Sequence, residues 1–236
     1  MNSIVECIRA ELKASVDPKT KLSAQKFFKE KIACYGVKTP VVDKIAQKYW
    51  KEINSFDKKN IFALCEELFS SDFMEEAFVV SSWLPNMIDR LEPSDILTFK
   101  VWIERYIDNW AKCDSFCNHT IGDLIDKYPE TVVEVKSWAK SNCRWLKRAS
   151  AVSLILPARK GGFLKEAFEI SNTLLTDEDD MVQKGYGWLL KEASKKHQKE
   201  VFDFVIKNKK TMPRTALRYA VELMPKEFKG EAMKKD

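Results

Sequence analysis

The sequence predicts an all-α fold in which helix pairs repeat along the chain and stack into a curved α-solenoid. Three observations lead to this prediction. Only seven glycines and eight prolines occur in 236 residues, too few for the turns of a β-sandwich, a barrel or a Rossmann-type sheet. Apolar residues recur at three- and four-residue spacing almost everywhere, and the sequence repeats internally. We expect a single domain over residues 1–236.

The individual helices follow from this periodicity and from the residues that interrupt it. Asp17-Pro18, Thr39-Pro40, Ser94-Asp95 and Gly161-Gly162 provide helix caps, first-turn residues or breaks. The predicted helices are, in order, 2–15, 21–35, 40–53, 58–70, 73–90, 94–108, 110–127, 130–141, 144–156, 163–175, 179–193, 198–208 and 213–224. No segment has the alternation of a β-strand.

The internal repeat aligns five windows that begin at Phe73, Trp110, Trp145, Val182 and Met212, and spacings of 30 to 37 residues are typical of helix pairs. The third position of four windows is a cation: Lys112, Lys147, Lys184 and Arg214. The fifth position is alanine in three windows, which indicates a tight helix contact, and Asp114 in another. If the second helix of each pair lines a concave groove, these cations form a ladder suited to a phosphate backbone. The alternative is a set of solvent-facing first turns on unrelated helices.

Charge and composition narrow the classes of partner. The net charge of +5 is uneven, because residues 144–236 carry 20 Lys and Arg against 13 Asp and Glu. This excess favours an anionic partner such as nucleic acid, although lysine-rich helix faces are often only solvated. No apolar run is long enough for a membrane span, and no secretion signal is recognisable, so we expect a bacterial-type cytoplasmic protein that associates with DNA and not with a membrane.

The cysteines and histidines exclude two further kinds of site. Six scattered cysteines indicate free thiols in a reducing compartment. Cys113, Cys117 and His119 lack zinc-ligand spacing, so we expect no metal. Two histidines and no nucleophile elbow leave little material for a hydrolytic triad.

Three constellations remain as candidates for chemistry. Trp110 and Asp114 lie four residues apart and share a helix face, where a core aromatic and a surface charge are the alternative interpretation. Trp145-Leu146-Lys147-Arg148 presents a guanidinium that could fork onto a phosphate or pair with an acid such as Asp114. Gly185 and Gly187 fall inside a helix next to Trp188, which indicates close approach of another surface or a ligand, although Trp188 could equally be a core residue.

Together these motifs resemble the DNA alkylation repair family of HEAT-like repeat glycosylases, the AlkD family. The resemblance also includes Gly36-Val37-Lys38-Thr39-Pro40, Gln183-Lys184 through Gly187-Trp188, and the final Arg214–Arg218 helix, and it covers most of the chain. It implies excision of positively charged N3- and N7-alkylated purines from double-stranded DNA without metal or organic cofactor, and we expect the protein to be a monomer.

The resemblance also implies roles for individual residues. Residues that match Trp110, Asp114 and Trp188 surround the sugar of the damaged nucleotide, and the residue that matches Arg148 contacts the backbone. Phe27 stands where the family's DNA-facing N-terminal helix can carry a tyrosine, and Asp108-Asn109 replaces a stretch that can carry a second tryptophan. These departures leave the acid in place.

The implied reaction is chemically reasonable. A purine alkylated at N3 or N7 is cationic and departs as a neutral base, so no general acid is required. Positive charge grows on the deoxyribose, and a fixed carboxylate such as Asp114 stabilises it and orients water. Two alternatives remain: a non-catalytic paralogue that binds distorted or branched DNA, and a protein-binding repeat scaffold.

Overall fold

The computed structural model describes residues 3–234, and these confirm the predicted all-α class. The only β-type pairing among them is an isolated bridge between Ala33 and Phe73. The α-helices are α1 (Ile4–Ala14), α2 (Pro18–Phe27), α3 (Thr39–Ile53), α4 (Lys58–Phe69), α5 (Met74–Trp83), α6 (Asp95–Tyr106), α7 (Trp110–Phe116), α8 (Gly122–Lys127), α9 (Val132–Trp138), α10 (Arg144–Val152), α11 (Ile155–Lys160), α12 (Leu164–Thr173), α13 (Asp180–Ala193), α14 (Gln198–Asn208), α15 (Arg214–Ala220) and α16 (Lys226–Met233).

Two compact units make up the chain. Unit 1 contains the residues up to Glu92 together with Arg105–Phe116, and unit 2 contains Pro93–Glu104 and the chain from Cys117 onward. The single domain expected over residues 1–236 stays a prediction.

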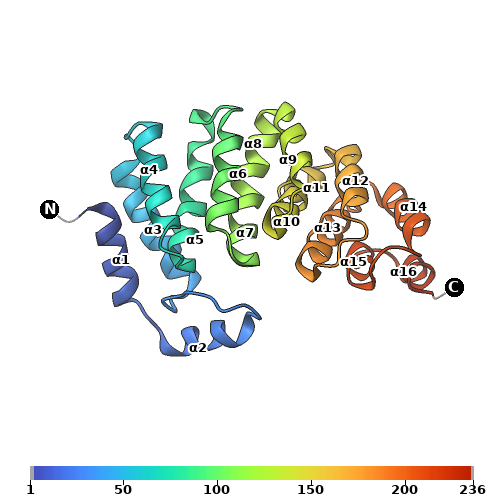
Figure 1. The fold of residues 1–236 in the computed structure, drawn as a ribbon, viewed down its shortest axis with the longest axis horizontal. Coiled ribbons are helices and arrows are strands. Elements are labelled where there is room, and N and C mark those ends of the chain that lie inside the picture. Colours follow the sequence, from blue (N-terminus) through green and yellow to red (C-terminus); the bar gives the residue numbers. More distant parts are fainter. Residues whose placement is uncertain (1–2, 235–236) are drawn as a thin grey trace. The chain divides into compact units, whose positions relative to one another are not determined.

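In unit 1 the core forms around α5, which packs against α3, α4 and α7 (Figure 1). Val79, Val80 and Trp83 of α5 are fully buried, and the Trp83 indole donates a hydrogen bond of 2.8 Å to the Ala46 carbonyl of α3. Apolar residues on successive faces of this short helix explain why α5 lies inside the unit, with none of its residues exposed.

In unit 2 the corresponding central helix is α13, which packs against α10, α11, α12 and α15 (Figure 1). The predicted windows from Trp145, Val182 and Met212 fall on α10, α13 and α15. The fifth position of each window is fully buried, at Ala149, Tyr186 and Ala216. The repeat therefore marks a packing position, as the alanines predicted.

Several predicted helix boundaries were wrong. The helix expected over 21–35 begins at Pro18 and ends at Phe27, because Phe28 adopts an extended backbone with ψ of 139°. The chain then runs without helix to Thr39, and we call residues 28–38 the 28–38 segment. The helix expected over 144–156 ends at Val152, and α11 and α16 were not predicted as separate helices.

The helix expected over 110–127 is interrupted by a π-helical turn, Cys117–Ile121. The helix expected over 73–90 changes to a 3-10 helix at Leu84–Arg90, where Pro85 has no amide hydrogen for the α-helical pattern. No helix within residues 3–234 is both long and apolar enough to cross a membrane.

Candidate functional site

Trp110 and Asp114 lie one turn apart on α7 in unit 1, as their spacing predicted. Asn109 starts this helix, because its side-chain oxygen accepts a hydrogen bond of 3.0 Å from the Lys112 amide. The Asn109 side-chain amide in turn donates to Asp108 at 2.8 Å. The Asp108-Asn109 departure from the family pattern therefore builds the N-terminus of α7, which carries the candidate acid. Asp114 itself is only 8% exposed, so its carboxylate lies in a medium where charge interactions are stronger than in water.

Three aromatic rings form a cluster at the N-terminus of α7. The Phe28 ring stacks on Trp110, with 5.3 Å between centroids and an interplanar angle of 17°. The Phe27 ring meets Trp110 edge-on at 5.9 Å and Phe28 edge-on at 5.6 Å. Phe27 is 70% exposed, whereas Phe28 and Trp110 are half-buried. The structure thus brings together two predicted site residues, Phe27 and Trp110, and adds Phe28, which the sequence reasoning missed.

Lys112 does not occupy the surface position that the cation ladder predicted. It is 1% exposed, and its ammonium donates to the Asp72 carbonyl at 2.7 Å and lies 3.0 Å from the Asp108 carboxylate. Burying an ammonium is unfavourable unless such partners replace water. Lys112 therefore ties the turn before α5 to α7, and we leave it out of the candidate interface.

Glu75 occupies the same position in the first window and also has an internal role. Its carboxylate is 2% exposed and accepts hydrogen bonds from the amides of Tyr35, Gly36 and Val37 at 3.0, 2.7 and 3.0 Å. The neighbouring Glu76 accepts from the Tyr35 hydroxyl at 2.6 Å. These acids of α5 hold the end of the 28–38 segment.

Arg148 of α10 lies in unit 2 and is nearly buried, at 5% exposure. Its guanidinium donates a hydrogen bond of 2.5 Å to the Met181 carbonyl on α13. The Arg148 side chain passes next to Gly185, where an added methyl group would lie 3.4 Å from the Arg148 Cγ atom, an ordinary contact. The space around this glycine therefore has room for a methyl group.

The second glycine, Gly187, faces α15. A Cβ atom at this position would lie 2.7 Å from the Tyr219 Cβ atom and 2.8 Å from the Ala216 carbonyl oxygen. The close approach expected from the sequence is therefore a helix-to-helix contact inside unit 2, and it requires glycine.

Trp188 follows directly and is half-buried. Its indole donates a hydrogen bond of 3.3 Å to Glu192, one turn further on. Burial of Glu192 raises its pKa, but hydrogen bonds from Lys195 and Arg159 lower it more, so the pKa lies below its ordinary value. The ionised Glu192 carboxylate thereby holds both the cations and the indole.

The remaining predicted cations are more accessible than Lys112. Lys147 pairs with Asp177 at 2.7 Å and Lys184 with Asp180 at 2.6 Å, each with more than a quarter of its side chain exposed. Arg214 and Arg218 of α15 are exposed, and Arg214 donates to the Met233 carbonyl at 3.2 Å. Asp177, before α13, and Asp180, its first residue, thus pair with two of the cations expected to meet phosphate.

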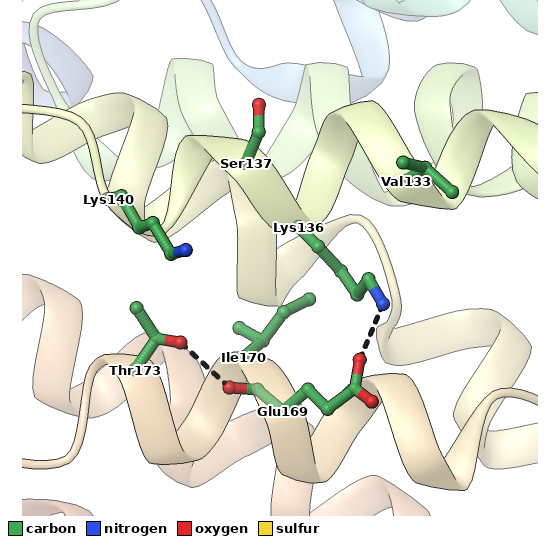
Figure 2. A pocket seen from close by; sticks show the side chains of 7 residues that line it. All are labelled: Val133, Lys136, Ser137, Lys140, Glu169, Ile170 and Thr173. Atoms are coloured by element: carbon green, nitrogen blue, oxygen red, sulfur yellow. Dashed lines mark hydrogen bonds and ion pairs between the residues drawn. The ribbon is translucent and has the colours of Figure 1, made fainter.

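A separate pocket of about 320 Å³ lies between α9 and α12, and none of the predicted site residues lines it (Figure 2). Lys136 and Glu169 pair across it at 2.5 Å, and the Thr173 hydroxyl donates to the Glu169 carbonyl. Its polar groups serve helix packing, so we give more weight to two separate sets of candidate residues, one on α7 in unit 1 and one on α10 and α13 in unit 2. The residues that line this pocket between α9 and α12 are Val133, Lys136, Ser137, Lys140, Glu169, Ile170 and Thr173.

Fold and side chains define a class: an all-α helical-repeat protein with a buried carboxylate one turn from a tryptophan in unit 1, and with cations at matching repeat positions in unit 2. A family model described as DNA alkylation repair enzyme matches residues 8–224, and the chain belongs to this family. No match was found among curated proteins.

Two solved structures share the fold. One is described as a predicted DNA alkylation repair enzyme from Enterococcus faecalis, with a TM-score of 0.81 and 15% identity, over 90% of this chain and 98% of that one. The other is the Pseudomonas fluorescens alkylpurine DNA glycosylase AlkC bound to DNA containing an abasic site analog. It gives a TM-score of 0.53 and 15% identity, over 97% of this chain and 64% of that one. At these identities the likeness establishes the fold alone.

Proposed function

We propose that this protein is a DNA glycosylase that hydrolyses the N-glycosidic bond of cationic N3- and N7-alkylated purines, such as 3-methyladenine and 7-methylguanine, in duplex DNA. Membership of the DNA alkylation repair enzyme family supports the pathway. The observation that carries the proposed reaction is the buried Asp114 carboxylate, one turn from Trp110 on α7. A carboxylate would weaken a groove that only bound phosphates, because like charges repel.

The proposed reaction uses the charge already present on the lesion. The bond between C1′ and the purine nitrogen breaks with its electrons moving to the base, which departs neutral. Water adds to C1′ and loses a proton to solvent, leaving an abasic site. Asp114 stabilises the positive sugar in the transition state and orients the water. Trp110 and Trp188 present π faces to the cation, an interaction worth about 0.5–2 kcal/mol each.

We assign the DNA backbone contacts to Lys147, Lys184, Arg214 and Arg218, which expose charge at the surface of unit 2. Arg148 keeps the backbone role that the family resemblance implies, while its guanidinium also supports α13. Phe27 is the exposed ring expected to meet DNA from unit 1. Such contacts position a duplex without reading its sequence.

The test measures release of 3-methyladenine and 7-methylguanine from methylated duplex DNA in the presence of EDTA, because no metal is invoked. Wild-type protein and the matched control Asp43→Asn, which alters an exposed carboxylate on α3, should release base. Asp114→Asn should lose most of this activity while it still folds and binds DNA. Salt-sensitive binding without base release from the wild type would favour the non-catalytic paralogue. Equal release by wild type and Asp114→Asn would refute the proposed role of the acid.

A further inference from the structure

We infer that Phe28 is a positioning residue for Trp110: its stacked ring fixes the orientation in which the Trp110 indole meets the damaged nucleotide. This inference rests on the proposed glycosylase function and adds a residue that the family resemblance does not assign. It is carried by the geometry of the Phe28–Trp110 stack and by the way in which the 28–38 segment is fastened.

The stack constrains the orientation of the Trp110 indole at the start of α7. Trp110 is the first residue of α7, so no preceding helical turn packs against its indole. The Phe28 ring lies nearly parallel to the indole, at 17° and 5.3 Å between centroids, the offset arrangement that aromatic pairs prefer. Phe28 therefore limits the rotamers of Trp110 before any ligand arrives, which is the condition for a preorganised site.

The backbone on both sides of Phe28 holds its ring next to Trp110. α2 ends as the Phe28 amide donates to the Ala24 carbonyl at 3.2 Å, and the chain turns to an extended conformation. Beyond Phe28, the 28–38 segment is held by the Ala33–Phe73 bridge and by the Glu75 carboxylate. Both ends of the segment are therefore fixed within unit 1, and the ring has little freedom to leave Trp110.

The rest of α2 does not account for this arrangement. None of its residues is buried, so the helix has no core face of its own. Its start is held where the Asp17 amide donates to the Gly36 carbonyl at 2.9 Å, and Gly36, at φ +91°, lies directly against Lys21. At the other end of α2, Phe27 and Phe28 pack against Trp110.

The two phenylalanines are expected to act differently. Phe27 exposes most of its ring and touches Trp110 only by its edge, so its loss should weaken DNA binding. Phe28 is half-buried and stacked, so its loss should change the reacting geometry more than the affinity. This difference separates a positioning role from a simple contribution to the DNA-binding surface.

The experiment compares wild type, Phe28→Ala, Phe28→Tyr and Phe27→Ala on a duplex with one 7-methylguanine. Single-turnover base release gives the chemical step, and fluorescence anisotropy with an undamaged duplex gives affinity. Phe28→Ala should slow base release about 3- to 10-fold, the range that loss of one aromatic stack allows, with affinity changed less than about two-fold. Phe28→Tyr, which keeps the ring, should restore the wild-type rate. Phe27→Ala should instead weaken binding.

A second measurement reports on the stack without any reaction. Acrylamide quenching of tryptophan fluorescence gives the accessibility of Trp110 when each protein is compared with the same protein carrying Trp110→Phe. Phe28→Ala should increase this accessibility roughly two-fold. Thermal unfolding checks that the variants fold. An unchanged rate for Phe28→Ala, or failure of Phe28→Tyr to restore it, overturns the inference while leaving the glycosylase proposal intact. No base release by wild type overturns both, and the quenching then still decides whether the stack exists.

Discussion

Replacing Gly187 by alanine is expected to destabilise the protein, whereas the same change at Gly185, two residues earlier on α13, is expected to stabilise it. Both substitutions add one methyl group to a helix interior, where alanine is favoured over glycine by about 1 kcal/mol. Propensity alone therefore predicts a gain at both positions. The neighbours of each added methyl group decide the sign.

At Gly187 the added Cβ would lie 2.7 Å from the Tyr219 Cβ atom, 2.8 Å from the Ala216 carbonyl oxygen and 3.1 Å from the Ala216 Cα atom. Backbone atoms and a Cβ cannot move aside without displacing α15, so the cost falls in the upper part of the range for overpacking, about 2–3 kcal/mol. After the gain in helix propensity, the net loss is about 1–2 kcal/mol. At Gly185 the nearest atom is the Arg148 Cγ at 3.4 Å, an ordinary contact, so the gain of about 0.5–1 kcal/mol should remain.

Urea and thermal unfolding of wild type and the two variants, followed by circular dichroism, test this pair. For a chain of this size the Gly187→Ala loss corresponds to a fall in Tm of roughly 2–8 °C, and Gly185→Ala should raise Tm by roughly 1–4 °C. A Gly187→Ala variant as stable as wild type would refute the close contact between α13 and α15. If Gly185→Ala lost as much stability as Gly187→Ala, the contacts with these neighbours would not determine the effect of the added methyl group.

Three further predictions follow from buried and paired charges. Glu75→Gln should lower the free energy of unfolding by about 1.5–3 kcal/mol, since one amide oxygen cannot replace a carboxylate that accepts three backbone hydrogen bonds. Urea unfolding measures this loss, with Glu52→Gln as the control at an exposed position. Equal stabilities of the two variants would contradict the prediction. Asp180→Asn releases Lys184 and removes a negative charge, so duplex affinity should rise and the salt dependence should steepen, as anisotropy titrations at several salt concentrations would show; an unchanged affinity would place Lys184 away from DNA. Because the pKa of Glu192 is lowered, its ion pairs with Arg159 and Lys195 stabilise the folded protein at pH values above its ordinary pKa of 4.5. This stabilisation is lost as the pH falls through the lowered pKa. Wild type should therefore lose more stability than Glu192→Gln between about pH 5 and pH 3, as urea unfolding at several pH values would measure. Equal losses in the two proteins would argue against the stabilising ion pairs of Glu192.

Local patterns determined which segments are helical and which residues recur. The spacing of apolar residues and the caps were enough to predict the all-α class and most helices, because these signals act within a few residues of each other. The repeat predicted that the fifth window position is a packing position, and Ala149, Tyr186 and Ala216 are indeed fully buried. The same alignment singled out Asp114 as an acid where other windows carry alanine.

Only the tertiary structure decided what each recurring side chain does. Lys112 and Lys147 occupy the same place in the repeat, yet Lys112 is buried against a carbonyl and a carboxylate, whereas Lys147 is partly exposed and pairs with Asp177. Phe28 lies more than 80 residues before Trp110 in the sequence, and their stack depends on where α2 ends and on the hold of Glu75 over the 28–38 segment. Repeat position sets the direction of a side chain on its own helix, but a partner such as the Asp72 carbonyl, which holds Lys112, comes from a segment far away in the chain, and no local pattern encodes which distant segments will meet.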